Sequence, residues 1–404
     1  MAKMKKLLIL NILSTIIFFS FTGFSQTELK KAESFLYYED YDSALFYLQK
    51  ALKKEPNNEN IYLLKGKVLY RKKNFNGALN NFNLSNKLKP GIANFYLAKT
   101  YAKMGNVDKS CNLLEDLIKN RDVSVSEVKR DKDLKLVVHN KCFDEIISKV
   151  RISSYENLLN ELWFDIKYKN YNEALNKIDE VLKKNNRKHY LFYLKGKILL
   201  LNKDTLGALK NFSEAYNLKK NEKKYICSYS EALLLKKKPK KALSVLKLKL
   251  KKFANDPFYM RLYAKALYYS GKYSQASVVL EDSVLKYLYK DTMSYFFLAK
   301  SYYKMGKYFP AMRNINKAIK LYPENDEFIF LRGKIYFETR AYRLALKEFR
   351  YIVDLKPFVG EYYYFLALTQ LNFGDKFNAC KNFKKAFSLK YMKADDFLRK
   401  ECVK

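Results

Sequence analysis

The feature that most constrains the fold of this chain is an internal repeat of about 34 residues. A small residue recurs at nearly equal steps, at Ala44, Ala78, Ser110, Ala174, Ala208, Ala242, Ala276, Ala311, Ala345 and Ala379. The steps are 34, 32, 64, 34, 34, 34, 35, 34 and 34 residues. A fixed period of this length is typical of proteins that stack similar supersecondary units, because each unit buries its apolar face against its neighbours.

Other slots repeat together with the small residue. A large apolar residue follows four positions later, at Leu48, Phe82, Phe212, Leu280, Phe349 and Phe383. A second small residue stands twelve positions earlier, at Gly66, Ala98, Gly196, Ala264, Ala299, Gly333 and Ala367. Spacings of three, four and seven residues place side chains on one helix face, so we expect two closely packed helices per unit.

Turn residues divide the units where two helices should meet. Glycine is expected to end the first helix at Gly105, Gly271, Gly306 and Gly374. Proline is expected to end the second helix, because it cannot continue the helical hydrogen bonds, at Pro56, Pro90, Pro257, Pro323 and Pro357.

These slots resemble the tetratricopeptide-repeat pattern over roughly residues 27–390. The resemblance implies an all-α fold, a right-handed α-solenoid of about ten helix–turn–helix units. It also implies protein binding rather than a particular chemistry, because this family is defined by its architecture. The segment from Asn378 to Cys402 is similar to the endings of many exported bacterial repeat proteins of this kind.

The pattern predicts five segments. Residues 1–25 are predicted to be a signal peptide, 26–118 a first block of about three repeats, and 119–153 an irregular insertion of one or two helices. Residues 154–390 are predicted to hold about seven further repeats, and 391–404 a capping helix that covers the last apolar face.

The first 25 residues have the features of an export signal. Lys3, Lys5 and Lys6 precede an apolar run, and the small residues Gly23 and Ser25 would precede cleavage before Gln26. The apolar run is about 15 residues long, shorter than the roughly 20 that span a bilayer. We therefore expect an exported protein, periplasmic or associated with the outer membrane, with no transmembrane segment in the mature chain.

The cysteines suggest two disulfide bonds, which export would permit. Cys380, in the last repeat's second helix, and Cys402, at the end of the expected cap, should lie side by side if the two helices are antiparallel. Cys111 and Cys142 flank the first half of the insertion in a similar way. The alternative is separate buried thiols, and Cys227 would in either case be left over.

No arrangement of residues in the sequence predicts an enzyme. Walker, GxSxG, HExxH and GxGxxG motifs are absent. The two histidines, His139 and His189, stand apart and no CxxC pair occurs, so neither a metal site nor a cofactor is expected. His139 lies three residues from Cys142, a spacing that we interpret as simple packing of neighbours.

The resemblance also implies which residues face a partner, since the first helix of each unit lines the concave groove in this family. Most units carry lysine directly after the first helix's small residue, with large residues four before and three after it. The predicted groove residues are Lys67, Tyr70, Phe95, Lys99, Tyr193, Lys197, Arg261, Lys265, Tyr268, Phe296, Lys300, Tyr303, Phe330, Lys334, Phe337 and Tyr364. This ladder suits an extended acidic peptide, with carboxylates on the ammonium groups and apolar side chains on the rings. Alternatively, the lysines only lie over the rings and keep the groove soluble.

Charge supplies a second functional hypothesis. The formal net charge is +37, and loss of the three signal-peptide lysines would leave +34. The excess is mostly lysine and is spread along the chain, which does not favour nucleic acid. The sequence thus leaves two hypotheses, a protein-interaction scaffold of the bacterial envelope and a basic module that binds anionic envelope polymers or acidic surfaces.

Overall fold

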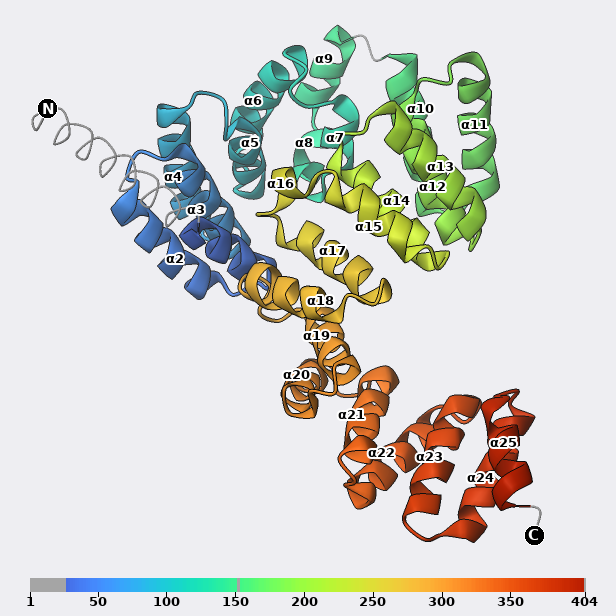
Figure 1. The fold of residues 1–404 in the computed structure, drawn as a ribbon. Helices are drawn as coiled ribbons and strands as arrows, with labels where there is room; N and C mark the ends of the chain where they lie inside the picture. Colours follow the sequence, from blue (N-terminus) through green and yellow to red (C-terminus); the bar gives the residue numbers. More distant parts are fainter. Residues whose placement is uncertain (1–26, 151–152, 403–404) are drawn as a thin grey trace, which may run out of the picture. The chain divides into compact units, whose positions relative to one another are not determined.

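The computed structural model describes residues 27–150 and 153–402, and within these ranges the chain consists of helices and short connections without a strand (Figure 1). The predicted signal peptide, residues 1–25, lies outside the described ranges. No helix within those ranges is both long and apolar enough to cross a membrane. The chain divides into two compact units between Asn186 and Arg187.

The first unit begins with a helix over residues 27–37. It continues with α2 (Tyr41–Lys54), α3 (Glu59–Arg71), α4 (Phe75–Leu88), α5 (Asn94–Lys103), α6 (Val107–Lys119), α7 (Val125–Arg130), the 3-10 turn η1 (Lys132–Leu134), α8 (Lys135–Val138), α9 (Lys141–Lys149), α10 (Ser154–Lys167) and α11 (Tyr171–Lys184).

The second unit contains α12 (His189–Leu201), α13 (Thr205–Leu218), α14 (Lys223–Leu235), α15 (Pro239–Lys247), α16 (Leu250–Phe253), α17 (Pro257–Tyr269), α18 (Tyr273–Val279), the π-helical η2 (Leu280–Leu285), α19 (Thr292–Lys304), α20 (Tyr308–Leu321), α21 (Asp326–Glu338), α22 (Tyr342–Leu355), α23 (Gly360–Asn372), α24 (Lys376–Ser388) and α25 (Lys393–Glu401).

Successive helices form packed pairs, as the repeat predicts. Within the described residues the pairs are 27–37 with α2, α3 with α4, α5 with α6, α10 with α11, α12 with α13, α14 with α15, α17 with α18, α19 with α20, α21 with α22, and α23 with α24. The prediction of an all-helical solenoid of about ten helix–turn–helix repeats is therefore confirmed.

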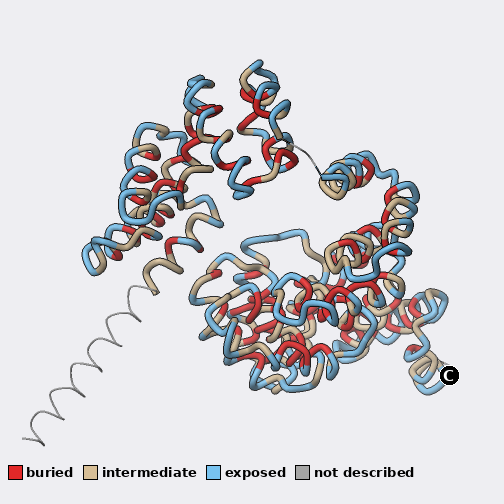
Figure 2. The backbone as a smooth tube through the Cα atoms, turned by 90° about the horizontal axis from the view of Figure 1, so that it is seen from above, coloured by how far each residue is buried: buried red, intermediate tan, exposed pale blue. Residues whose placement is uncertain are grey.

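Contact between a small residue and a ring joins the two helices of a pair. A Cβ added to Gly333 of α21 would lie 2.7 Å from the ring of Phe349 of α22, and the same distance separates a Cβ at Gly196 from Phe212. Both rings are buried, and Figure 2 shows buried backbone alternating with exposed backbone along the helices. The large slot of one helix is thus filled by a ring that only a small residue opposite can accommodate.

The turn inside each pair is closed by a residue with positive φ. Gly105 has φ of 79°, and its N–H donates to the carbonyl of Ala102 at 3.1 Å, while Asn106 donates to Tyr101 at 2.9 Å. These bonds satisfy carbonyl groups at the end of α5, as predicted for the glycine slot. In other helix pairs the turn residue with positive φ is Glu39, Lys73, Lys169, Lys203, Lys237 or Arg340.

Proline follows the second helix in most of the predicted places. α4 ends at Leu88 before Pro90, and α22 ends at Leu355 before Pro357. Pro257 differs from the prediction, since it is the first residue of α17. At that position the missing N–H has no partner to lose inside the helix.

Residues 119–153 contain more elements than the one or two helices predicted for the insertion. The end of α6 is followed by α7, η1, α8 and α9, and all four are short. Val128, Leu134 and Phe143 of this segment are fully buried in one core with Leu114 of α6. The segment thus packs on the preceding repeat through its own apolar residues.

The C-terminal helix α25 covers the last repeat. Ala394 is fully buried, and the ring of Phe397 stacks on Phe383 of α24 with centroids 5.1 Å apart. This packing hides an apolar face that would otherwise meet solvent, as expected of a capping helix.

Two disulfide bonds join the predicted pairs of cysteines. Cys380 of α24 is bonded to Cys402 after α25, with Cα atoms 5.6 Å apart, and Cys111 of α6 is bonded to Cys142 of α9, with Cα atoms 6.3 Å apart. Cys227 is a free, partly buried thiol. The first bond ties the cap to the last repeat, and the second ties the insertion to the repeat before it.

Replacing Phe349 with alanine should destabilise the second unit by about 3–5 kcal/mol, because it leaves a cavity opposite Gly333. Hydrogen–deuterium exchange of α21 to α23 should show the loss. The control is Tyr351→Ala on the same helix, whose side chain is 49% exposed. Equal losses in the two variants would contradict the packing role of the aromatic slot.

Replacing both Cys380 and Cys402 with serine should lower the stability of the cap by about 3 kcal/mol, since the bond closes a loop with a sequence separation of 22 residues. Hydrogen–deuterium exchange of the backbone amides of α25 should become much faster, whereas that of α3 and α4 should stay unchanged. Unaltered protection of α25 would show that its apolar contacts alone hold the cap.

Candidate interaction face

The predicted groove residues all lie on first helices of the pairs, namely α3, α5, α12, α17, α19, α21 and α23. In the second unit α17, α19, α21 and α23 contact one another in turn, whereas no comparable contact joins α20 with α22 or α22 with α24. The first helices are therefore the more closely spaced row. We call the surface formed there by Lys265, Lys300 and Lys334 with the rings around them the lysine face.

Burial separates the predicted residues into three groups. Tyr70, Tyr268 and Phe296 are buried, and Lys197 is exposed. The partly buried residues are Lys67, Phe95, Lys99, Tyr193, Arg261, Lys265, Lys300, Tyr303, Phe330, Lys334, Phe337 and Tyr364. The buried rings form the floor beneath the lysines and offer little surface on which a ligand could stack.

On the lysine face each ammonium group lies over aromatic rings from adjacent helices. Lys300 Nζ is 4.9 Å from the centroid of Phe296 on its own helix and 5.1 Å from that of Tyr268 on α17. Lys334 Nζ is 4.7 Å from the centroid of Phe365 on α23. The ring faces attract the cations, yet they do not neutralise them.

Lys300 keeps a charge that no carboxylate pairs directly. Burial lowers its pKa, and the neighbouring cations Lys304 and Lys265 lower it further, against the opposing attraction of Glu327 and Glu361. Burial also lowers the pKa of Lys334, the next lysine along the face. Neither ammonium group forms an ion pair with the described residues, so this face has cations available for an anionic ligand.

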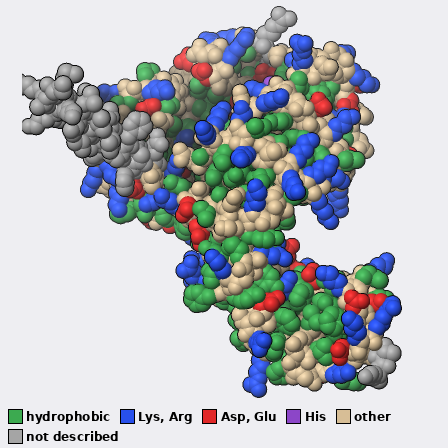
Figure 3. Space-filling model, viewed as in Figure 1, with side chains coloured by type: hydrophobic (Ala, Val, Ile, Leu, Met, Phe, Trp, Pro, Cys, Tyr) green, Lys and Arg blue, Asp and Glu red, His purple; other side chains and the backbone are tan. Residues whose placement is uncertain are grey.

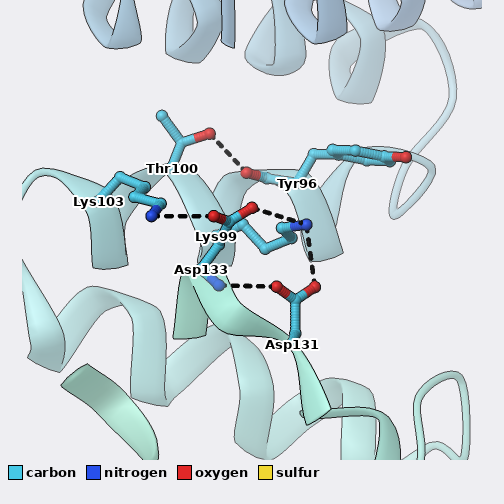
Figure 4. A network of polar contacts seen from close by, with 6 residues as sticks. All are labelled: Tyr96, Lys99, Thr100, Lys103, Asp131 and Asp133. Carbon is cyan, nitrogen blue, oxygen red and sulfur yellow. Dashed lines mark hydrogen bonds and ion pairs between the residues drawn. The ribbon is translucent and has the colours of Figure 1, made fainter. Parts of the chain in front are cut away.

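The same slot in the first unit has acidic partners. Lys99 Nζ contacts Asp131 Oδ2 at 2.9 Å and Asp133 Oδ2 at 3.1 Å, and Lys103 Nζ contacts Asp133 Oδ1 at 2.9 Å (Figure 4). Asp133 belongs to η1, and Asp131 caps it by accepting a hydrogen bond from the N–H of Asp133 at 2.9 Å. The insertion therefore supplies carboxylates to a predicted groove residue.

These ion pairs change the acidity of their members. Burial alone would lower the pKa of Lys99, but Asp131 and Asp133 raise it above its usual value. Burial alone would raise the pKa of Asp133, but bonds to Lys103 and Lys99 bring it down to about 2. Burial and the nearby carboxylate of Asp133 raise the pKa of Tyr70, so its phenol stays protonated.

Two of the predicted groove residues are already engaged by other parts of the chain and are not available to a ligand. Arg261 Nη1 contacts Asp291 Oδ1 at 2.7 Å, so its charge is already paired. Tyr364 packs against Tyr391 and Phe397 at centroid distances of 5.1 and 5.8 Å, as part of the core beneath the cap. In the last repeat the predicted slot therefore serves packing.

Sequence reasoning missed the acidic members of the network. Asp131 and Asp133 lie in the insertion, where the repeat gives no register, and Lys103 was outside the slots considered. A lysine pair four residues apart at 99 and 103, and a pair of aspartates two apart at 131 and 133, are the signals that could have been combined.

On the face of the molecule that Figure 3 draws, basic side chains are spread out rather than collected in one patch. Figure 3 shows Lys and Arg scattered across the visible face, with Asp and Glu between them. This agrees with the even distribution of lysine along the sequence.

Replacing Asp133 with asparagine should lower the free energy of unfolding of the first unit by about 1–3 kcal/mol at pH 7, because Lys99 and Lys103 lose a charged partner. The folded pKa of Asp133 lies below its ordinary value, so its contribution is present above about pH 4 and disappears as the pH falls toward 2. Urea midpoints at pH 7 and pH 2.5 measure this difference.

The control for this variant is Asp144→Asn on α9, whose side chain is exposed and outside the network. The destabilisation by Asp133→Asn should be large at pH 7 and clearly smaller at pH 2.5, whereas the control should be close to wild type at both. A pH-independent loss would contradict the ionic origin of the effect.

Two segments of the chain match family models. Residues 38–120 match the model described as anaphase-promoting complex, cyclosome, subunit 3, and residues 298–360 match the model described as tetratricopeptide repeat. A search of the curated proteins found no match to this sequence.

Solved structures of repeat proteins are similar to the chain. A tetratricopeptide repeat protein from Parabacteroides merdae ATCC 43184 is 17% identical, with a TM-score of 0.51 over 61% of this chain and 98% of that one. The APC/C hetero-tetramer Cut9-Hcn1 is 12% identical, with a TM-score of 0.49 over 92% of this chain and 89% of that one.

Tetratricopeptide-repeat proteins generally act as non-catalytic scaffolds that bind other proteins or peptides, and neither matching model is that of an enzyme family. Two segments of this chain therefore match repeat-family models, and the residues that the structure describes fold as a tetratricopeptide-repeat-like helical solenoid.

Proposed function

We propose that this protein is an exported, non-enzymatic scaffold of the bacterial cell envelope, which binds partner proteins through the first helices of its repeats. The observation that carries the proposal is the lysine face. Its ammonium groups lie over rings and have no ion pair among the described residues, so binding an acidic partner would replace solvent contacts without breaking internal bonds.

Two features support the envelope as the compartment. The signal-like residues 1–25 predict export, and the two disulfide bonds suit an oxidising compartment. The stacked repeats favour a scaffold, because such stacks present an extended surface that can hold several contacts at once.

The alternative function is a basic module that binds anionic envelope polymers or acidic surfaces. It is supported by the formal charge of +37 and by the scattered basic residues seen in Figure 3. Such binding would depend on total charge and would weaken steeply with salt, since it releases counterions.

An affinity capture from envelope fractions tests the two functions against each other. The bait is the chain without residues 1–25, washed at low and at high salt, with captured material identified by mass spectrometry. We expect a defined set of proteins that survives high salt and shrinks when Lys300 and Lys334 are both replaced by methionine. The control replaces Lys317 and Lys320, exposed lysines of α20, in the same way.

The opposite outcome is a mixture of anionic molecules that high salt removes and that both double variants reduce equally. This outcome would overturn the scaffold function in favour of the basic module. A cytoplasmic product that still carries residues 1–25 would overturn the proposed location.

A further inference from the structure

Two first helices, one in each unit, have nearly the same sequence. Residues 95–105 read FYLAKTYAKMG and residues 296–306 read FFLAKSYYKMG, with identical residues at eight of eleven positions. The shared residues include the small slot, the lysine after it, a second lysine four positions later and the turn glycine. Such similarity goes beyond the general repeat, whose units share little more than size and polarity at most slots.

The side chains around the two lysines are also equivalent. Lys99 Nζ lies 5.7 Å from the centroid of Tyr70, on the preceding first helix, and 5.9 Å from that of Phe95 on its own. Lys300 is in the same relation to Tyr268 and Phe296, at 5.1 and 4.9 Å.

A third ring completes each set. Tyr96 lies 5.9 Å from Lys99 Nζ, and Phe297 lies 5.6 Å from Lys300 Nζ. The residue after each lysine also makes the same bond, because its hydroxyl donates to the carbonyl of that third ring residue, at 2.6 Å for Thr100 and at 2.8 Å in α19. The two sites are therefore alike in backbone, floor and charge.

What differs is the occupant. Asp131 and Asp133 bind Lys99 and Lys103, whereas Lys300 and Lys304 have no ion pair among the described residues. The pKa values of the two lysines are therefore shifted in opposite directions. The carboxylates raise the pKa of Lys99, whereas burial lowers that of Lys300. The second site thus carries the same two ammonium groups as the first, but no carboxylate of the described residues pairs with them.

We propose that Lys300 and Lys304 of α19 bind a partner segment that carries two aspartates one residue apart, as Lys99 and Lys103 bind Asp131 and Asp133. The inference rests on the scaffold function proposed above and names the chemistry of the partner. The expected motif is Asp-x-Asp in a short helical turn, as in η1, where Asp131 accepts a hydrogen bond from the N–H of Asp133.

A peptide segment fits this site better than a polymer of repeating charge. The two carboxylates are fixed by a turn in which Asp131 caps the N–H of Asp133, and one of them bridges both lysines. This bridging requires a defined spacing between carboxylates, whereas a flexible anionic chain would satisfy any lysine on the surface equally.

The probe is a fluorescein-labelled peptide with the sequence of residues 129–136, in which the basic residues are replaced by alanine. Its affinity for the chain without residues 1–25 is measured by fluorescence anisotropy. We expect saturable binding that weakens roughly tenfold or more when Lys300 and Lys304 are both replaced by methionine, because two charged contacts are lost while the apolar stems remain. The matched control replaces Lys317 and Lys320, which removes the same charge from α20.

Two control peptides test the motif. One carries asparagine in place of both aspartates, and the other keeps both aspartates but separates them by five residues. Both should bind at least tenfold more weakly than the probe. Equal binding of the second control, or equal effects of the two lysine variants, would mean attraction to total charge and would overturn the inference.

The outcomes separate this inference from the proposed function. Captured envelope proteins that are insensitive to the Lys300 and Lys304 variant would leave the scaffold in place and overturn the motif. Binding of the probe at α19 without any captured partner would leave the motif in place and overturn the scaffold.

Discussion

The contact between a small residue on one helix and a buried ring on the next supports the rest of the structure. Gly333 against Phe349 and Gly196 against Phe212 bring the two helices of a pair so close that a Cβ would already meet the ring. This contact fixes the rotation of the first helix wherever it occurs, as it also does for Gly66 against Phe82. A residue that follows the small slot must then point away from the ring, toward the surface of the first-helix row.

That rotation explains why lysine recurs in the next slot. Its ammonium group comes to lie over rings from its own and the adjoining helices, where its apolar stem covers carbon atoms and its charge meets the ring faces. A cation held in this way loses some of its hydration without gaining a counterion, and the lowered pKa of Lys300 reflects this cost. The architecture thus produces a row of partly desolvated cations.

The sequence was sufficient for the parts of the protein that obey the repeat. Helix pairs, the glycine turns and the cap followed from fixed spacings, because each depends on local register, whereas the two cysteine pairings were expected with separate buried thiols as the alternative. The network of Asp131 and Asp133 did not, since residues 119–153 carry no repeat and their fold depends on burying Leu134 and Phe143 on α6. Tyr364 occupies a predicted groove slot but belongs to the core under the cap, because the stack ends there and α25 takes the place of a further repeat.

The two units show the same lysine site in two electrostatic states. Around Lys99 the chain itself provides carboxylates, so that site contributes to the stability of the insertion and to holding it in place. Around Lys300 the next repeat continues the stack, and the carboxylates of Glu327 and Glu361 act on it through space without forming ion pairs. A solenoid can therefore use one helix sequence in two ways: as an internal joint where the chain supplies the acid, and as an open site where it does not. Which use prevails is decided by the segment that follows the helix rather than by the helix itself.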